Sequence, residues 1–160
     1  MKLVEPAFTL GVEEEYLLVD LETRALVSDP PPALMVEYTR RCGERVSPEF
    51  MRSQIEIGTT VCKDVHQAER ELKQLRGAIA DVSRQFGYAP IAVSTHPFSR
   101  WLEQKQTEKE RYADLNREMQ ATARRLLICG MHVHVGIEDR ELRIDIMNQL
   151  SYFLPHLLAL

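Results

Sequence analysis

The chain has 160 residues, 44% of them hydrophobic, and carries a formal net charge of -4. This length fits one domain with a sizeable buried core, and an acidic balance without a basic run argues against a nucleic-acid surface. Three cysteines without C-x-x-C spacing fit reduced thiols, and no apolar stretch reaches the ~20 residues that span a bilayer. We therefore expect a cytoplasmic protein with small-molecule partners, no nucleic acid and no membrane.

The first strand is predicted over residues 8–20, FTLGVEEEYLLVD. Alternation places Glu13 and Glu15 on one face, with Tyr16 and other apolar residues on the opposite face. Two residues along a strand are roughly 6.6 Å apart, so these carboxylates are spaced to hold two adjacent divalent cations. A solvated acidic strand edge is the alternative, and Glu14, which interrupts the apolar face, favours it.

A short strand and two helices are predicted next along the chain. Residues 25–28 are expected to return as a short strand. The prolines at 30–32 begin a helix that ends at Gly43, because proline suits the first helical turn and glycine the position after the last. Asp64 caps a second helix, whose apolar residues recur at the spacing of an amphipathic helix, and Gly87 ends it.

A second two-faced strand is predicted over residues 52–61. Gln54 and Glu56 lie on its polar face, and isoleucines lie on the other. A proline-bound loop with His96 and Arg100 follows a short buried strand at residues 88–93. Either these two side chains contact an anionic substrate, or the loop is a packed turn with a purely structural role.

The third two-faced strand is predicted over residues 127–137, LICGMHVHVGI. His132 and His134 share one face with glycines, which leaves open space above the imidazoles. A histidine on a strand is commonly a structural residue, whereas two at this spacing between glycines also fit a pair of ligands. Both interpretations stay open on these residues alone.

Two further helices are predicted in the second half of the chain. One covers residues 108–126, and the other begins after Asp139 and is kinked at Pro155. Its last turn is apolar and has no capping glycine, which is unusual for the end of a complete domain. We therefore expect the chain to be part of a larger protein, or to have a partner that covers this end.

The polar faces of the three strands become informative when they are placed in one sheet. Their apolar sides would pack under the helices, and their polar sides would converge in a carboxylate-rich bowl. Carboxylates with one imidazole suit Mg²⁺ or Mn²⁺ bound together with phosphate oxygens, whereas zinc would ask for more histidine or cysteine. The sequence thus predicts a metal site that handles phosphate.

Four motifs, in this order and spacing, resemble the N-terminal part of the bacterial carboxylate-amine ligases: GVEEEYLLVD, SQIEIGTT, STHPF and CGMHVHVGI. This family is also called glutamate-cysteine ligase type 2, and the same strands resemble those of glutamine synthetase. The resemblance runs from Phe8 to Leu160. It implies an α+β, glutamine synthetase-like catalytic domain, with an antiparallel sheet lining the site and helices packed on the other face. Residues 1–160 would form a single partial domain, truncated at its C-terminal end.

The resemblance also implies which residues form the site. Glu15 and Glu56 match ligands of one metal ion, while Glu13 and His132 match ligands of another that lies against the ATP phosphates. The cofactors would be ATP with Mg²⁺ or Mn²⁺. Glu13 and Glu56 are the residues expected to carry the catalysis.

The chemistry implied by the resemblance is ATP-dependent phosphorylation of a carboxylate, typically the γ-carboxyl of glutamate. An amine such as that of cysteine would then attack the acyl phosphate to form an amide, without a protein nucleophile. Gln54 and His134 match pocket positions of the cofactor site. The resemblance leaves the amine acceptor unassigned. The apolar terminus favours a homo-oligomer or association with the missing C-terminal part.

Two other functions are compatible with the residues. A metal-dependent hydrolase would use His132 and His134 as a zinc pair, and tightly bound zinc without ATP dependence would favour it. A non-catalytic assembly module would act through the apolar helix end, and a folded oligomer that binds neither metal nor nucleotide would favour that function.

Overall fold

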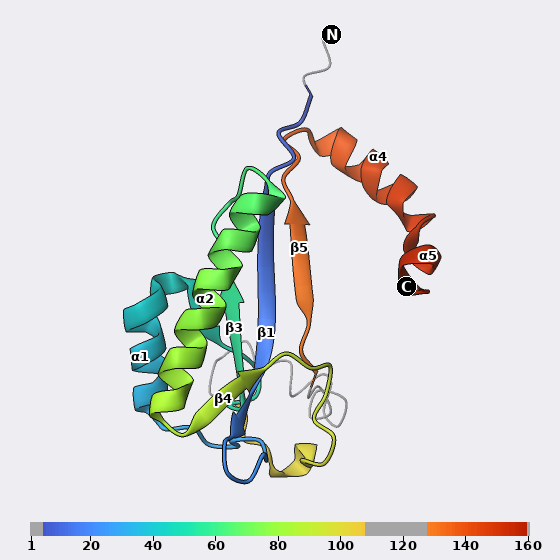
Figure 1. Ribbon diagram of the computed structural model, residues 1–160. Helices are drawn as coiled ribbons and strands as arrows, with labels where there is room; N and C mark the ends of the chain where they lie inside the picture. Colours follow the sequence, from blue (N-terminus) through green and yellow to red (C-terminus); the bar gives the residue numbers. More distant parts are fainter. Residues whose placement is uncertain (1–4, 108–127, 160) are drawn as a thin grey trace.

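The protein is built on one antiparallel sheet, seen in Figure 1. A computed structural model describes residues 5–107 and 128–159. The strands are β1 (Leu10–Asp20), β2 (Val46–Pro48), β3 (Gln54–Gly58), β4 (Tyr88–Ile91) and β5 (Met131–Val135). β3 lies along one edge of β1 and β2 continues the sheet beyond it, while β4 and β5 share the other edge of β1 end to end. The predicted α+β fold with an antiparallel sheet is confirmed.

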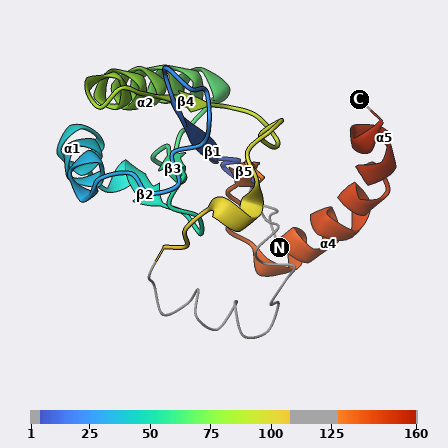
Figure 2. The same cartoon turned by 90° about the horizontal axis from the view of Figure 1, so that it is seen from below.

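Two helices, α1 (Pro32–Cys42) and α2 (Val65–Gln85), lie on the same side of this sheet (Figure 2). α1 has proline at its start and is followed by Gly43, whose φ of 66° is the left-handed conformation that glycine adopts at low cost. α2 begins where the Asp64 side chain accepts a hydrogen bond from the Gln67 backbone N–H at 2.8 Å. Both predicted helices are confirmed.

The main core lies between these helices and the sheet. Tyr38 of α1 and Ile79 of α2 are fully buried there against Leu18 and Ile57 of the strands. Fully burying a side chain of this size contributes roughly 1.5–3 kcal/mol, so the apolar residues of the two helices fix them to one side of the sheet. The opposite side of the sheet is left for polar groups.

A second, smaller core closes one end of that opposite side. Leu17 and Val19 of β1 are buried there under Phe50 and Met51, with Leu26 beside them. Leu17 and Val19 share a face with Glu13 and Glu15, because they lie an even number of residues away from these glutamates along the strand. The polar face is therefore covered at the Asp20 end of β1 and open at the end where the glutamates lie.

Several predicted elements differ in extent. The strand expected at 25–28 is reduced to an isolated bridge between Leu26 and Val19, since the Leu18 N–H, which would continue the ladder, donates to the Ser53 carbonyl at 2.8 Å. β3 and β5 are shorter than the stretches 52–61 and 127–137. The helix expected at 108–126 lies outside the described residues.

The second half ends in two short helices, α4 (Arg140–Ser151) and α5 (Leu154–Leu158), which extend away from the sheet (Figure 1). The Asp139 side chain caps α4 by accepting from the backbone N–H groups of Glu141 and Leu142. The predicted break is confirmed, because Pro155 lies at the start of α5, where proline is tolerated. In the described parts of the chain, no helix is long and apolar enough to cross a membrane.

Candidate functional site

The strand register brings the polar residues of three strands onto the same face. Glu15 lies directly opposite Glu56 of β3, and Glu13 lies opposite His132 of β5. His134 lies opposite Gly11, two residues before Glu13 in β1. Directly opposed residues of an antiparallel pair share a face of the sheet, so these side chains all project from the side that α1 and α2 leave uncovered.

Glu13 is bonded to both histidines. Its Oε2 lies 2.9 Å from Nε2 of His134 and 3.5 Å from Nδ1 of His132. The hydrogen bond from His134 is the main reason that the pKa of Glu13 is held below its ordinary value. This first cluster therefore presents an ionised carboxylate between two imidazoles at the open end of the face.

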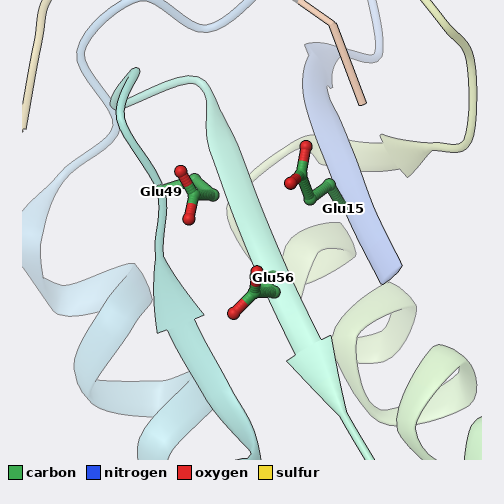
Figure 3. A group of neighbouring side chains, drawn as sticks. All are labelled: Glu15, Glu49 and Glu56. Atoms are coloured by element: carbon green, nitrogen blue, oxygen red, sulfur yellow. The ribbon is translucent and has the colours of Figure 1, made fainter. Parts of the chain in front are cut away.

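A second cluster contains three carboxylates from three neighbouring segments (Figure 3). Glu15 of β1, Glu56 of β3 and Glu49, which follows β2, each place an oxygen within 4.8 Å of the other two. The Gly130 N–H donates to Glu15 at 3.0 Å, and the Ser47 hydroxyl donates to Glu56 at 3.4 Å. These bonds orient the carboxylates without neutralising them.

The electrostatics of this second cluster disfavour the charged form of Glu56. Burial raises the pKa of Glu56, and the nearby charges of Glu49, Glu13 and Glu15 raise it further, which outweighs the bond from Ser47. Like charges held this close destabilise one another unless a cation lies among them. Three carboxylates suit a hard divalent cation such as Mg²⁺ or Mn²⁺, so the residues fit the metal implied by the sequence.

A polar cavity of approximately 240 Å³ lies beside both clusters. Glu13 and Glu56 line it, Gly58 and Thr59 of the β3 end form another part of its wall, and Arg45 contributes a positive charge. The cavity joins the first cluster to the second. Glu44 lines it next to Arg45, so its wall carries charges of both signs.

Gln54 also projects from this face, but its amide group makes hydrogen bonds within the protein. The side chain is buried, its Nε2 donates to the Ile128 carbonyl at 2.8 Å, and its Oε1 accepts from the Met51 N–H at 3.3 Å. Its observed contacts thus join β3 to the segment that leads into β5. In the described residues it lines neither the polar cavity nor the carboxylate cluster.

His96 has a structural role in its loop, which was one of the two interpretations of this segment. His96 is buried, its Nδ1 accepts from the Ser99 N–H at 3.1 Å, and its Nε2 lies 3.0 Å from the Arg24 carbonyl. Because Nδ1 is the acceptor, Nε2 carries the proton that bonds to the carbonyl. The imidazole fixes a turn, and both of its nitrogens are occupied.

Glu49 is the one cluster member that the sequence analysis missed. It lies just beyond β2, a strand of three residues that has too little alternation to be recognised. The signal that identifies it is the hairpin register: Ser47 pairs with Glu56, and Glu49, two residues further along, shares the face of Ser47. A carboxylate seven positions before Glu56 becomes its neighbour only when that hairpin is known.

The fold and this acidic face define a class of α+β domain with a predicted metal site on an antiparallel sheet. The model of glutamate-cysteine ligase family 2 (GCS2) matches residues 9–160. The chain therefore belongs to the glutamate-cysteine ligase family 2.

Related proteins carry the provisional name glutamate–cysteine ligase 2. One from Rhodospirillum rubrum is 58% identical over 160 residues, which is 98% of this chain and 41% of that protein. One from Paracoccus denitrificans is 57% identical over 156 residues, again 98% of this chain and 41% of the relative. The chain thus spans about two fifths of the length of the curated relatives that it matches.

Two solved structures share the fold. A bifunctional glutathione synthetase from Pasteurella multocida matches with a TM-score of 0.65 at 18% identity, over 88% of this chain and 18% of that chain. A glutamate–cysteine ligase from Francisella tularensis, solved in complex with AMP, matches with a TM-score of 0.65 at 15% identity, over 92% of this chain and 30% of that chain. At these identities the likeness concerns the fold alone.

Proposed function

We propose that this chain is the metal-bearing part of an ATP-dependent carboxylate-amine ligase. The observation that carries the proposal is the convergence of four carboxylates and two imidazoles on the open face of one sheet. Membership of a glutamate-cysteine ligase family supports it, and so does the shared fold with a ligase that was solved with AMP. Residues 1–160 would form one partial catalytic domain.

The two clusters would hold two divalent cations, Mg²⁺ or Mn²⁺. Glu15, Glu49 and Glu56 would hold one, and Glu13 with His132 would hold the other. Such cations neutralise the charge that develops on phosphate oxygens during phosphoryl transfer. The raised pKa of Glu56, caused by burial and by neighbouring carboxylates, supports the first assignment, because that carboxylate has a charge in need of a cation.

The proposed reaction has two steps. An oxygen of the γ-carboxylate of glutamate attacks the terminal phosphorus of ATP, and ADP leaves. The amine of an acceptor such as cysteine then attacks the acyl carbon, the phosphate leaves with the bonding electron pair, and the nitrogen loses a proton. The residues of this chain would bind and orient the substrates: His134 holds Glu13 at 2.9 Å, and Arg45, which lines the polar cavity, would be a counter-charge for phosphate.

The partners would be glutamate, an amine acceptor and the remainder of the catalytic domain, in a homo-oligomer or in association with a further part of the chain. Neither alternative function gains support. The matched family and both solved structures carry ligase or synthetase names, and His132 and His134 both contact Glu13 on the face that also carries the three-carboxylate cluster.

Titration calorimetry of MnCl₂ into the chain tests the metal assignment directly. We expect Glu15→Gln and Glu56→Gln each to weaken Mn²⁺ binding at least tenfold, since loss even of a group that only supports a metal ligand costs about 10–100-fold. Glu69→Gln is the matched control, because Glu69 is exposed on α2 and paired with Lys73, and it should change the affinity less than about twofold. Unchanged Mn²⁺ affinity in both site variants would refute the assignment.

The ligase activity is tested with this chain extended by the part of the Rhodospirillum rubrum relative that it does not match. We expect ADP release that depends on glutamate and Mg²⁺, and its loss in Glu13→Gln and His132→Ala. Full ADP release from both variants would remove these residues from the mechanism. Tightly bound zinc in the purified protein, without ATP turnover, would favour the hydrolase instead.

A further inference from the structure

A second cavity, of approximately 640 Å³, lies between α2 and the start of β5, and Glu15 of the carboxylate cluster is among its lining residues. Ile79 and Ala80 of α2 form one wall, and Gly130 and Met131 at the start of β5 form the opposite wall. The cavity is therefore a groove between α2 and β5, and we call it the α2–β5 groove. The exposed surface of its lining is mainly apolar.

The face of β5 that continues this groove is apolar and exposed. Met131, Val133 and Val135 alternate with the two site histidines and so project to the side of the sheet that carries the helices. They are 63%, 56% and 50% exposed. α1 and α2 cover the same side over β1 and β3, while α4 and α5 run away from β5 and leave its face bare (Figures 1 and 2). Contiguous apolar patches of this kind mark interaction sites.

The outer edge of β5 is open as well. Within the described residues β5 pairs with β1 alone. The strand has the sequence MHVHV and carries none of the lysines, prolines or bulges that protect an exposed strand edge. Face and edge together present both apolar side chains and backbone hydrogen-bonding groups to a partner, which is the surface that a polypeptide covers.

We propose that the α2–β5 groove and the exposed face of β5 are the docking surface for an apolar helix of polypeptide from the part of the family's length that this chain lacks. The larger part of each curated relative has no counterpart here, so such polypeptide exists in the family. A helix is about 10 Å across and would lie beside α2 as the next member of the same layer. It would cover Val133 and Ala80 together.

The charges around the groove support an apolar partner. Among the described lining residues Arg76 is the cation, and its guanidinium is already paired with the buried carboxylate of Glu14. Binding of an anionic ligand would compete with that pair. A neutral apolar helix face leaves the pair intact.

The two other possible occupants fit the surface less well. Pairing of β5 with β5 of a second copy would cover the strand edges but leave the exposed valines bare, because a paired strand lies beside its neighbour in the sheet. A lipid surface attracts basic amphipathic segments, whereas α4 balances Arg140 and Arg143 with Glu141 and Asp145. A polypeptide helix is the occupant that covers the face itself.

The test is to co-express this chain with the unmatched part of the Rhodospirillum rubrum relative and to measure the complex. We expect a stable complex in which the amides of β5 exchange with deuterium at least tenfold more slowly than in the chain alone. Val133→Glu should weaken the complex at least tenfold. Val36→Glu is the matched control, because Val36 is 65% exposed on α1, and it should change binding less than about twofold.

The outcomes separate the proposal from its competitors. Equal binding by the Val133 and Val36 variants would overturn it, and so would a folded chain that forms no complex with the segment. Self-association that protects β5 without the segment would assign the surface to a second copy. A fusion of both parts in one chain gives a second measurement, in which Val133→Glu should lower the melting temperature more than Val36→Glu does. Mn²⁺ affinity should be equal in both variants, which keeps this result independent of the proposed catalysis.

Discussion

Three consecutive glutamates of β1 have opposite environments on the two faces of the sheet. Glu14 faces the helices, is almost completely buried, and is held by Arg76 and Tyr16: the Arg76 guanidinium contacts both carboxylate oxygens, and the Tyr16 hydroxyl donates to Oε2 at 2.6 Å. Glu13 and Glu15 face the open side, where the neighbours include Glu49 and Glu56 as well as histidines. On the helix side Glu14 has a guanidinium partner, whereas on the open side neighbouring carboxylates raise the pKa of Glu56.

The pKa values follow the same division. Burial alone would raise the pKa of Glu14, but the hydrogen bonds from Arg76 and Tyr16 outweigh it and hold the pKa below its ordinary value. Burial also raises the pKa of Glu56, and there the neighbouring carboxylates add to the effect. The comparison teaches that being a glutamate does not decide whether a residue stabilises the fold or belongs to the candidate metal site. A carboxylate held by a guanidinium stabilises the fold, whereas carboxylates close enough to raise the pKa of one another suit an external cation.

The largest effect is expected when the ion pair between Glu14 and Arg76 is broken. Arg76→Met leaves Glu14 buried without its cation, and we expect it to lower the free energy of unfolding by about 2 kcal/mol, roughly thirtyfold in the folding equilibrium. This is less than the about 3–5 kcal/mol for a fully buried pair, because the Arg76 side chain is half exposed. Urea denaturation measures the change.

The matched control for Arg76 lies on the same helix. Lys73→Ala removes an exposed pair, in which Nζ lies 2.6 Å from Glu69, and should cost less than about 0.5 kcal/mol. The double variant Glu14→Leu with Arg76→Met should recover part of the loss, since it removes the unpaired charge. Equal costs for Arg76→Met and Lys73→Ala would show that Glu14 does not depend on its partner.

The next effect concerns the carboxylate cluster on the open face, whose affinity for a metal ion should depend on pH. Mn²⁺ must displace any proton on Glu56, and because burial and like charges raise the pKa of this carboxyl, protons compete already above the ordinary glutamate range. We expect Mn²⁺ affinity to fall as the pH is lowered through the raised pKa, by up to about tenfold per pH unit for each proton displaced. The residual binding of Glu56→Gln should depend less on pH. Calorimetry across this range measures both.

The same shift has an opposite consequence for stability without metal. The folded state binds the Glu56 proton more tightly than the unfolded chain does, so this group reduces stability as the pH rises from the ordinary glutamate pKa through the raised one. The metal-free Glu56→Gln protein should lack this loss. A wild-type profile identical to that of the variant would mean that the pKa of Glu56 is not raised in the folded state.

The faces of the strands could be predicted from the sequence because alternation fixes which residues share a side. Glu13 with Glu15, and His132 with His134, were assigned correctly to common faces, and so were the apolar sides of β1 and β3. The helix boundaries followed from Asp64 and from the glycines at positive φ. Each of these features depends on a local rule of a few residues.

What depended on contacts distant in the sequence was missed. Glu14 was interpreted as an interruption of the apolar face, whereas it is bonded to Arg76, 62 positions away. The bond from the Gln54 amide to the carbonyl of Ile128, 74 positions away, was not predicted either. Glu49 required the register of a three-residue strand. No periodicity in one segment encodes such partners.

A smaller effect is expected from the Tyr16 hydroxyl, which is the second hydrogen-bond donor to Glu14. Tyr16→Phe removes the bond to Glu14 but keeps the ring in the core, where Tyr16 is buried. We expect a loss of about 1 kcal/mol, at the low end for a bond to a charged group because Arg76 remains. Tyr152→Phe, at a position that is 74% exposed, should be neutral within about 0.5 kcal/mol. Guanidinium denaturation of both variants decides whether the hydroxyl contributes.

The smallest effect sharpens the comparison most, because it uses the same substitution at adjacent positions. Glu15→Gln should change the free energy of unfolding by less than about 0.5 kcal/mol, since the amide oxygen still accepts from the Gly130 N–H and the cluster loses a repelling charge. Glu14→Gln should cost about 1 kcal/mol or more, because Arg76 loses its ionic partner. Equal costs in paired urea titrations would contradict the division, since the charge of a face would then not determine what its glutamates contribute.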